Sequence, residues 1–128
     1  MRDVVVIGGG VSGLAAVREL EAAGLNCTLI EVKRRLGGSL DSVRVGDFVF
    51  DCGPMCHHLR DPERFRAYVD RLDGLSTDAM TIDDNGTLVF EEGSGALIEA
   101  MRAGIQATVM LRMAVSSLGY LDTAEGHL

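Results

Sequence analysis

The pattern of apolar and polar residues divides the first part of the chain into a strand, a helix and a second strand. Residues 4–7 read Val-Val-Val-Ile, an uninterrupted β-branched run that is typical of a parallel strand buried on both faces. A helical periodicity extends over 11–23, and Gly24 follows it. A second apolar run at 27–30 leads to Glu31. We therefore expect a β-α-β unit at the N-terminus.

The rest of the chain carries weaker signals of the same kind. Asp61 and Pro62 mark a helix start, and four apolar residues follow at helical spacing: Phe65, Tyr68, Val69 and Leu72. Residues 84–86 read Asp-Asn-Gly, a typical hairpin turn. Ser94 is expected to cap a second helix, and a strand-like run lies at 108–111.

Glycines occupy the junction between the first strand and the first helix. Gly8, Gly10 and Gly13 fit G-x-G-x-x-G, in which the first allows a tight turn, the second a close ligand approach and the third close packing of helix and strand. Val11 and Ser12 lie in the first helical turn, where unpaired N–H groups and the helix dipole favour phosphates. A bare motif could be an ordinary glycine-rich loop, but its strand–helix–strand context predicts a nucleotide site.

An acidic residue ends the second predicted strand. Glu31 stands where a carboxylate can accept hydrogen bonds from ribose hydroxyls. Its charge would repel a 2′-phosphate, which disfavours NADP as the ligand.

A second group of motifs follows Glu31. Arg35 precedes the doublet Gly37-Gly38, and the run 48–50 leads into Asp-Cys-Gly-Pro at 51–54. In this order the sequence resembles the superfamily of flavin amine oxidases, protoporphyrinogen oxidases and phytoene desaturases. The resemblance implies FAD as the cofactor, with Gly37 and Gly38 close to the ligand and Arg35 beside its phosphates. Ser39 departs from the pattern, since many relatives have a second arginine there.

The resemblance continues more loosely after residue 88 and implies that Val115 contacts the adenine. It also implies an α/β fold, a three-layer FAD-type Rossmann domain with a mostly parallel sheet. We expect a single domain over 1–128, in which 57–87 is a shortened insertion and the substrate domain is largely absent.

By the same resemblance, the complete protein oxidises a small organic substrate by hydride transfer to flavin. We assign no catalytic residue. An alternative is a non-catalytic FAD- or NAD-binding module that a partner chain or a second copy completes, and a third is an NAD-dependent dehydrogenase domain. The binding-module alternative predicts an exposed apolar surface where the partner chain or second copy would dock.

Composition narrows the function classes. The chain has 47% hydrophobic and 24% charged residues, typical of a globular protein, and its net charge of −7 argues against nucleic acid as a partner. No apolar run is long enough to span a membrane, and the chain starts almost directly on a strand without a signal peptide, so the cytoplasm is the expected location. Cys52, Cys56, His57 and His58 could bind zinc by type, but no second ligand pair accompanies them. We therefore predict no metal site and treat both histidines as surface residues.

Overall fold

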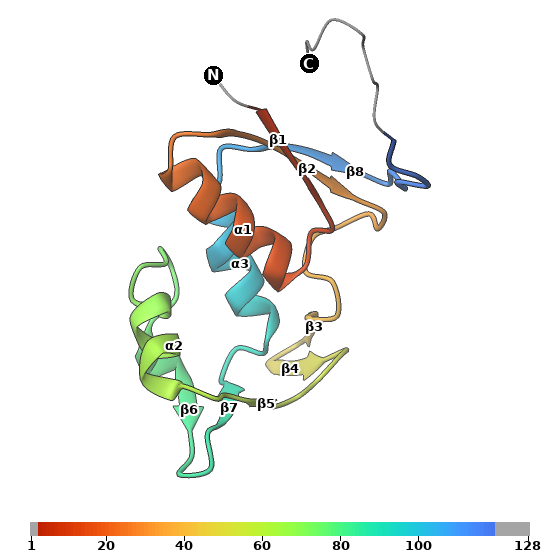
Figure 1. Ribbon diagram of the computed structural model, residues 1–128. Coiled ribbons are helices and arrows are strands. Elements are labelled where there is room, and N and C mark those ends of the chain that lie inside the picture. The colour runs from red at the N-terminus through yellow and green to blue at the C-terminus, as the bar shows by residue number, and fades with distance from the viewer. Residues whose placement is uncertain (1–2, 120–128) are drawn as a thin grey trace, which may run out of the picture.

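The computed structural model describes residues 3–119 and has a mixed α/β architecture (Figure 1). Strands β1 (Asp3–Ile7), β2 (Asn26–Glu31) and β8 (Thr108–Leu111) form a parallel sheet in the order β1-β2-β8. Helix α1 (Val11–Ala22) connects β1 to β2. The predicted β-α-β unit and the parallel Rossmann-type sheet are both confirmed.

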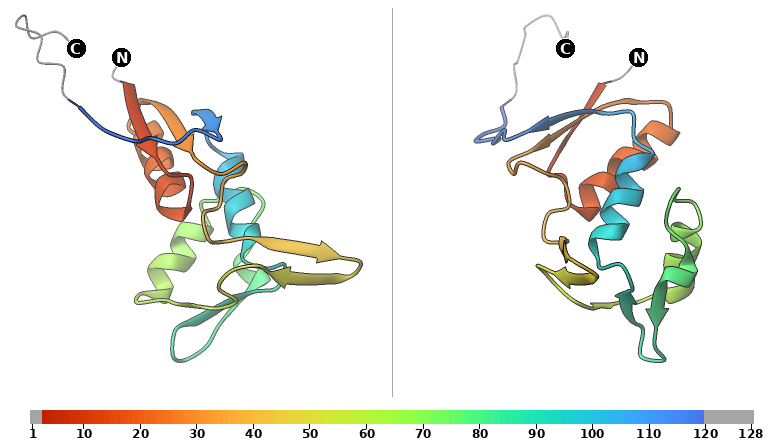
Figure 2. Two further views of the ribbon diagram at one scale, coloured as in Figure 1. Left: turned by 90° about the vertical axis from the view of Figure 1, so that its right-hand side faces the viewer. Right: turned by 180° about the vertical axis from the view of Figure 1, so that it is seen from behind.

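Two helices cover one face of this sheet. Helix α1 and helix α3 (Gly95–Ala103) lie on the same side of the sheet in both views (Figures 1 and 2). Their apolar side chains meet the inward side chains of β2 in one buried cluster, which includes Leu14, Val17, Leu29, Ile98 and Met101. Burial of these side chains supplies the main stabilisation of the sheet.

The other face of the sheet is exposed along β1 within residues 3–119. Exposed and half-buried residues alternate along β1, and Val5 and Ile7 are 57% and 51% exposed. The expectation that β1 is buried on both faces is therefore wrong for this part of the chain. The described residues form only two of the three expected layers, because no element of theirs packs on the outer face.

The middle of the chain forms a small antiparallel sheet with one helix. Strands β5 (His57–His58), β6 (Met80–Ile82) and β7 (Thr87–Phe90) pair in the order β5-β7-β6. The predicted hairpin turn joins β6 to β7. Helix α2 (Pro62–Val69) begins as predicted, since the Asp61 carboxylate accepts a hydrogen bond from the Arg64 N–H. The 3-10 helix η1 (Thr77–Ala79) leads into β6.

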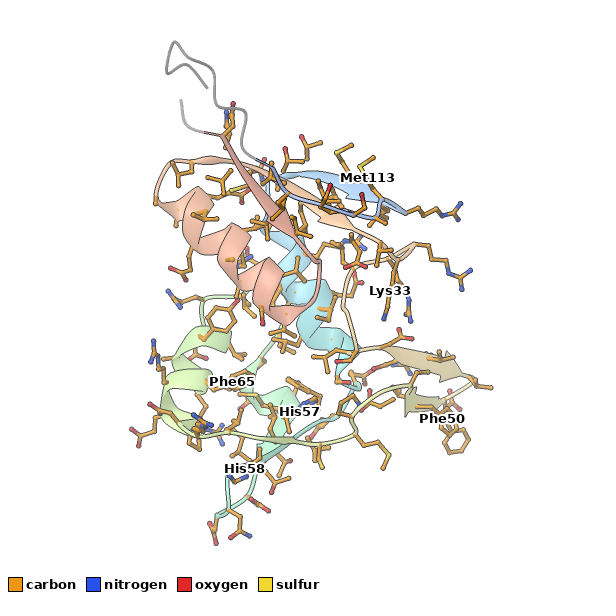
Figure 3. All side chains as sticks on the ribbon, turned by 45° about the vertical axis from the view of Figure 1, so that its right-hand side comes forward. Lys33, Phe50, His57, His58, Phe65 and Met113 are labelled. Carbon is orange, nitrogen blue, oxygen red and sulfur yellow. The ribbon has the colours of Figure 1, made fainter. Side chains whose placement is uncertain are left out.

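A two-stranded hairpin projects from the molecule between these parts (Figure 2, left). Strand β3 (Ser42–Val45) pairs with β4 (Phe48–Asp51), and directly opposed residues share a face. One face is wholly apolar and exposed, and it consists of Val43, Val45, Phe48 and Phe50. Phe50 points away from the body of the protein (Figure 3).

The opposite face of the hairpin caps helix α3. Ser42 Oγ accepts a hydrogen bond from the Gly95 N–H at 2.8 Å, and the Asp51 carboxylate accepts one from the Ser94 N–H at 2.8 Å. Ser94 occupies the N-cap position of this helix, as predicted, but its side chain makes no cap hydrogen bond. Its hydroxyl instead donates to Asp51, because the hairpin brings a carboxylate to the helix end.

One connected cluster of buried apolar residues joins the parallel sheet, the β5-β7-β6 sheet and helices α1, α2 and α3. The single-domain boundary of 1–128 stays a prediction. Among residues 3–119, no helix has the length and apolar character needed to cross a bilayer.

Candidate nucleotide-binding site

The glycine-rich turn after β1 and the glycine doublet after β2 lie against each other. The Gly37 N–H donates to the Gly9 carbonyl at 2.8 Å, and Gly10 and Gly37 form an isolated parallel bridge. A Cβ added at Gly38 would lie 3.1 Å from the Gly10 Cα. The two motifs, which are separate in the sequence, thus form one backbone surface.

Glycine stands at each of the three motif positions for a different reason. Gly8 has a φ of +99°, which favours glycine at this turn. A Cβ at Gly13 would lie 1.8 Å from the Gly8 carbonyl oxygen, so only glycine lets the helix start this close to the turn. A Cβ at Gly10 would lie 3.6 Å from the Gly38 Cα, an ordinary contact, so the fold itself does not require glycine at this position and the predicted reason remains close approach of a ligand.

The N-terminus of α1 opens onto this surface. No side chain caps the helix, and its first bond runs from the Leu14 N–H to the Gly10 carbonyl at 2.9 Å. The N–H groups of the first turn, at Val11, Ser12 and Gly13, therefore have no partner within the helix and are available to an anion. A pocket of about 500 Å³ lies here, and its wall consists of Ile7, Gly8, Gly10, Val11, Ser12, Gly13, Gly37, Gly38, Ser39, Leu40, Pro54 and His57.

Glu31 holds the glycine-rich turn to the end of β2. One carboxylate oxygen accepts a hydrogen bond from the Gly9 N–H and the other from the Lys33 N–H, both at 2.7 Å. The side chain is only 5% exposed. The N–H groups of Lys33 and Gly9 outweigh the effect of burial and lower the pKa of Glu31, so the carboxylate is ionised at neutral pH. Sequence reasoning had given Glu31 a ribose contact alone, and the structure adds a role within the chain.

Two of the three basic residues after Glu31, Lys33 and Arg35, bind other groups of the chain. Lys33 Nζ donates to the Gly38 carbonyl at 2.7 Å. Arg35 forms a bidentate ion pair with the Asp41 carboxylate. Arg35 does not line the pocket at the N-terminus of α1, which we call the glycine pocket. It lies instead at a second cavity of about 740 Å³, bounded by the hairpin, α3 and β8.

Val115 lies in the extended segment after β8, outside both cavities, and is 38% exposed. The segment runs beside the end of β2, because the Met113 N–H donates to the Glu31 carbonyl at 3.0 Å. Lys33 and Met113 lie at the same end of the sheet (Figure 3). The structure therefore brings Val115 near the Glu31 end of the sheet, separate from the glycine pocket.

Two features of the site were not found from the sequence. Asp51 accepts hydrogen bonds from Ser42 and Ser94, which explains the acidic residue of the Asp-Cys-Gly-Pro run. Burial alone would raise the pKa of Asp51, but these bonds outweigh it and lower the pKa. His57 was treated as a surface residue, yet it is half-buried in the pocket wall, and nothing in the two-residue strand β5 marks this in advance.

The cysteine and histidine cluster does not assemble as metal ligands. Within residues 3–119, no group of three or more Cys, His, Asp and Glu side chains converges in a metal-binding arrangement. Cys52 and Cys56 are both exposed.

Comparison with known proteins now gives the family. The sequence profile of the NAD(P)-binding Rossmann-like domain matches residues 6–72, more than half of the chain. The chain belongs to this family. The match begins at the end of β1 and includes both glycine segments and Glu31.

Curated relatives confirm the resemblance drawn from the motifs. The chain is 36% identical over 92 residues to a carotenoid 3,4-desaturase of Haloarcula japonica, covering 71% of this chain and 19% of the relative. It is 45% identical over 51 residues to a probable flavin-containing monoamine oxidase A of Dictyostelium discoideum, covering 40% and 11%. It is 43% identical over 62 residues to protoporphyrinogen oxidase 2 of Arabidopsis thaliana, covering 48% and 12%. The chain thus spans less than a fifth of the length of each of these relatives.

A solved structure shows the same fold. A putative protoporphyrinogen oxidase from Exiguobacterium sp. 255-15 superimposes with a TM-score of 0.69 at 15% identity, covering 94% of this chain and 55% of that one. The likeness concerns the fold alone.

Proposed function

We propose that this Rossmann-like domain binds the ADP half of FAD and is the nucleotide-binding part of a flavin-dependent oxidoreductase. The observation that carries the proposal is the meeting of the two glycine segments around the N-terminus of α1. Several backbone N–H groups face one pocket there, which is how Rossmann domains hold a pyrophosphate.

The proposal gives each predicted residue a part. The pyrophosphate would lie at Val11 and Ser12, between the glycine-rich turn and the doublet. Glu31 would accept hydrogen bonds from the ribose through the remaining lone pairs of its carboxylate oxygens. Val115 would contact the adenine, which agrees with its place beyond the Glu31 end of the sheet. Arg35 would reach the phosphates only by leaving Asp41.

The residues present fit such a ligand. A Cβ at position 38 would crowd Gly10 and fill part of the surface that the pyrophosphate needs, and the chain has glycine there. The buried, ionised Glu31 would repel a 2′-phosphate, which disfavours NADP. Bound FAD would supply the capacity to accept a hydride from a small organic substrate. We propose no catalytic residue, and we take residues 1–128 as one domain.

A second candidate function is a binding module without catalysis of its own, which another polypeptide completes. It is favoured by the bare outer face of the sheet at Val5 and Ile7 and by the apolar face of the β3–β4 hairpin. Exposed apolar surfaces of this kind are typical of sites that meet another chain.

The visible absorption spectrum of the purified protein, taken after incubation with FAD and desalting, tests both candidates. A retained flavin band supports a flavoprotein that holds the whole cofactor. A colourless protein that still binds ADP in calorimetry supports the binding module. ADP carrying a 2′-phosphate is the matched control, and we expect it to bind more weakly than ADP. Absence of both FAD and ADP binding would refute the nucleotide site.

A further inference from the structure

Among the described residues that line the glycine pocket, one has a titratable side chain. The proposed function assigns no role to it. His57 lies in β5, far in sequence from both glycine segments, and lines the pocket with Gly10, Ser12 and Gly38. It points toward the middle of the molecule, whereas its neighbour His58 lies at the outer rim (Figure 3). A histidine on this wall can donate a hydrogen bond to an anion at the N-terminus of α1.

The imidazole has an unmet hydrogen bond. His57 Nε2 is buried and has no hydrogen-bond partner among the described residues. The Phe90 ring lies beside the imidazole, with the two centroids 6.3 Å apart and the ring planes inclined at 63°. Buried polar groups are nearly always paired, and one that is not calls for an explanation. A purely structural position would be better served by an apolar side chain.

We propose that His57 is a further dinucleotide-binding residue, whose Nε2–H donates to a phosphate oxygen of the pyrophosphate. The inference rests on the proposed function, since it deepens the same site. Because Nε2 is closed off from solvent, the ring has to turn about χ2 toward the pocket that it already lines. The sequence then gives the pyrophosphate a third contact segment, after the glycine-rich turn and the doublet.

Three variants separate this role from a role in packing. His57→Phe keeps an aromatic ring of similar size and removes both nitrogens. His57→Gln keeps a donor. His58→Phe is the matched control, because His58 is exposed and does not line the pocket. Affinity for ADP and for adenosine is measured by calorimetry and the melting temperature by circular dichroism.

We expect His57→Phe to weaken ADP binding at least about fivefold, about 1 kcal/mol, while the affinity for adenosine stays unchanged because adenosine has no phosphate. The melting temperature should stay equal or rise, since an unpaired polar atom is removed from a buried position. His57→Gln should recover part of the ADP affinity, and His58→Phe should bind ADP like the wild type.

Equal ADP affinity of His57→Phe and wild type would overturn the inference while leaving the proposed function intact. A wild type that binds neither ADP nor FAD would refute the proposed function and this inference together. Should His57→Phe not fold, ring resonances of the wild-type histidines are followed by NMR during titration with inorganic pyrophosphate. Shifts of the His57 ring without shifts of His58 support the role, and an unmoved His57 ring overturns it.

Discussion

At the scale of single residues, Glu31 combines two roles: it holds the glycine-rich turn, and it is the predicted acceptor for ribose hydroxyls. The sequence motif indicates only the second. The Glu31 carboxylate anchors the Gly9 and Lys33 N–H groups, and it also lies where a ribose is expected. Loss of the carboxylate would therefore disturb the glycine-rich turn even before any nucleotide is present. Weaker binding by Glu31→Ala alone could not distinguish the two effects.

Glu31→Gln should lower the free energy of unfolding at neutral pH by about 1–3 kcal/mol, because the single amide oxygen leaves one buried N–H without an acceptor. The pKa of Glu31 is lower in the folded than in the unfolded chain, so its stabilisation is complete above the unfolded value of about 4.3 and is lost as pH falls through the folded pKa. The stability difference between wild type and Glu31→Gln should therefore shrink as the solution is acidified below about pH 4.3. Urea unfolding at a series of pH values measures this, and a difference that stays constant with pH would contradict the anchoring role.

The doublet offers a second test at the residue scale, with a matched control. Gly38 and Gly46 have φ values of +65° and +60°, so alanine at either position costs similar backbone strain, about 1 kcal/mol. A Cβ at Gly38 would also lie 3.1 Å from Gly10, whereas one at Gly46 meets nothing within 4 Å. Gly38→Ala should weaken ADP binding roughly tenfold, about 1.4 kcal/mol, and Gly46→Ala should leave it unchanged. Equal ADP affinities of the two variants in calorimetry would remove the doublet from the site.

At the scale of elements, the hairpin β3–β4 owes its place to the end of helix α3. Ser42 and Asp51 face each other across the hairpin and supply the acceptors for the first N–H groups of the helix. An isolated two-stranded hairpin is marginally stable in water, so these bonds stabilise hairpin and helix together.

Asp51→Ala should therefore lower the free energy of unfolding by at least about 2 kcal/mol, since it removes a charged acceptor from three donated hydrogen bonds. Asp47→Ala is the control, because Asp47 is exposed in the turn of the same hairpin, and its effect should stay within about 0.5 kcal/mol. Chemical unfolding of both variants measures the difference. Equal stabilities would mean that the hairpin does not hold the helix.

The elements also show how far sequence reasoning reaches. The β-α-β unit, the glycine-rich turn and the start of α2 were predicted because each depends on neighbouring residues. The N-cap of α3 was placed correctly at Ser94, but the acceptors for its first N–H groups come from 53 and 43 residues earlier in the chain and were not predicted. His57 likewise reaches the pocket wall because the fold brings β5 next to the glycine segments, which lie earlier in the chain. The exposure of β1 depends on what covers a sheet, which an apolar run does not reveal.

At the scale of the whole molecule, strand β1 is exposed in two ways. Its outer face is bare, and within residues 3–119 it pairs with β2 alone, so its other edge is open. Edge strands are usually protected by charges, proline or bulges, and residues 4–7 of β1 have none of these. The strand has the composition of a central strand at the edge of the described sheet.

We expect the chain to self-associate, or to bind a partner chain, through the outer face of β1. Val5→Thr combined with Ile7→Thr should shift sedimentation at micromolar concentration toward the monomer, because threonine keeps the strand propensity and removes apolar surface. Val6→Thr is the control, since Val6 is half-buried and packs against the core. It should lower the free energy of unfolding by about 1–2 kcal/mol and leave association unchanged. A wild type that sediments as a monomer at every concentration and binds no hydrophobic dye would show that this face needs no partner. If Val6→Thr dissociates as readily as the outer-face variant, association depends on the fold as a whole and the outer face of β1 is not the contact surface.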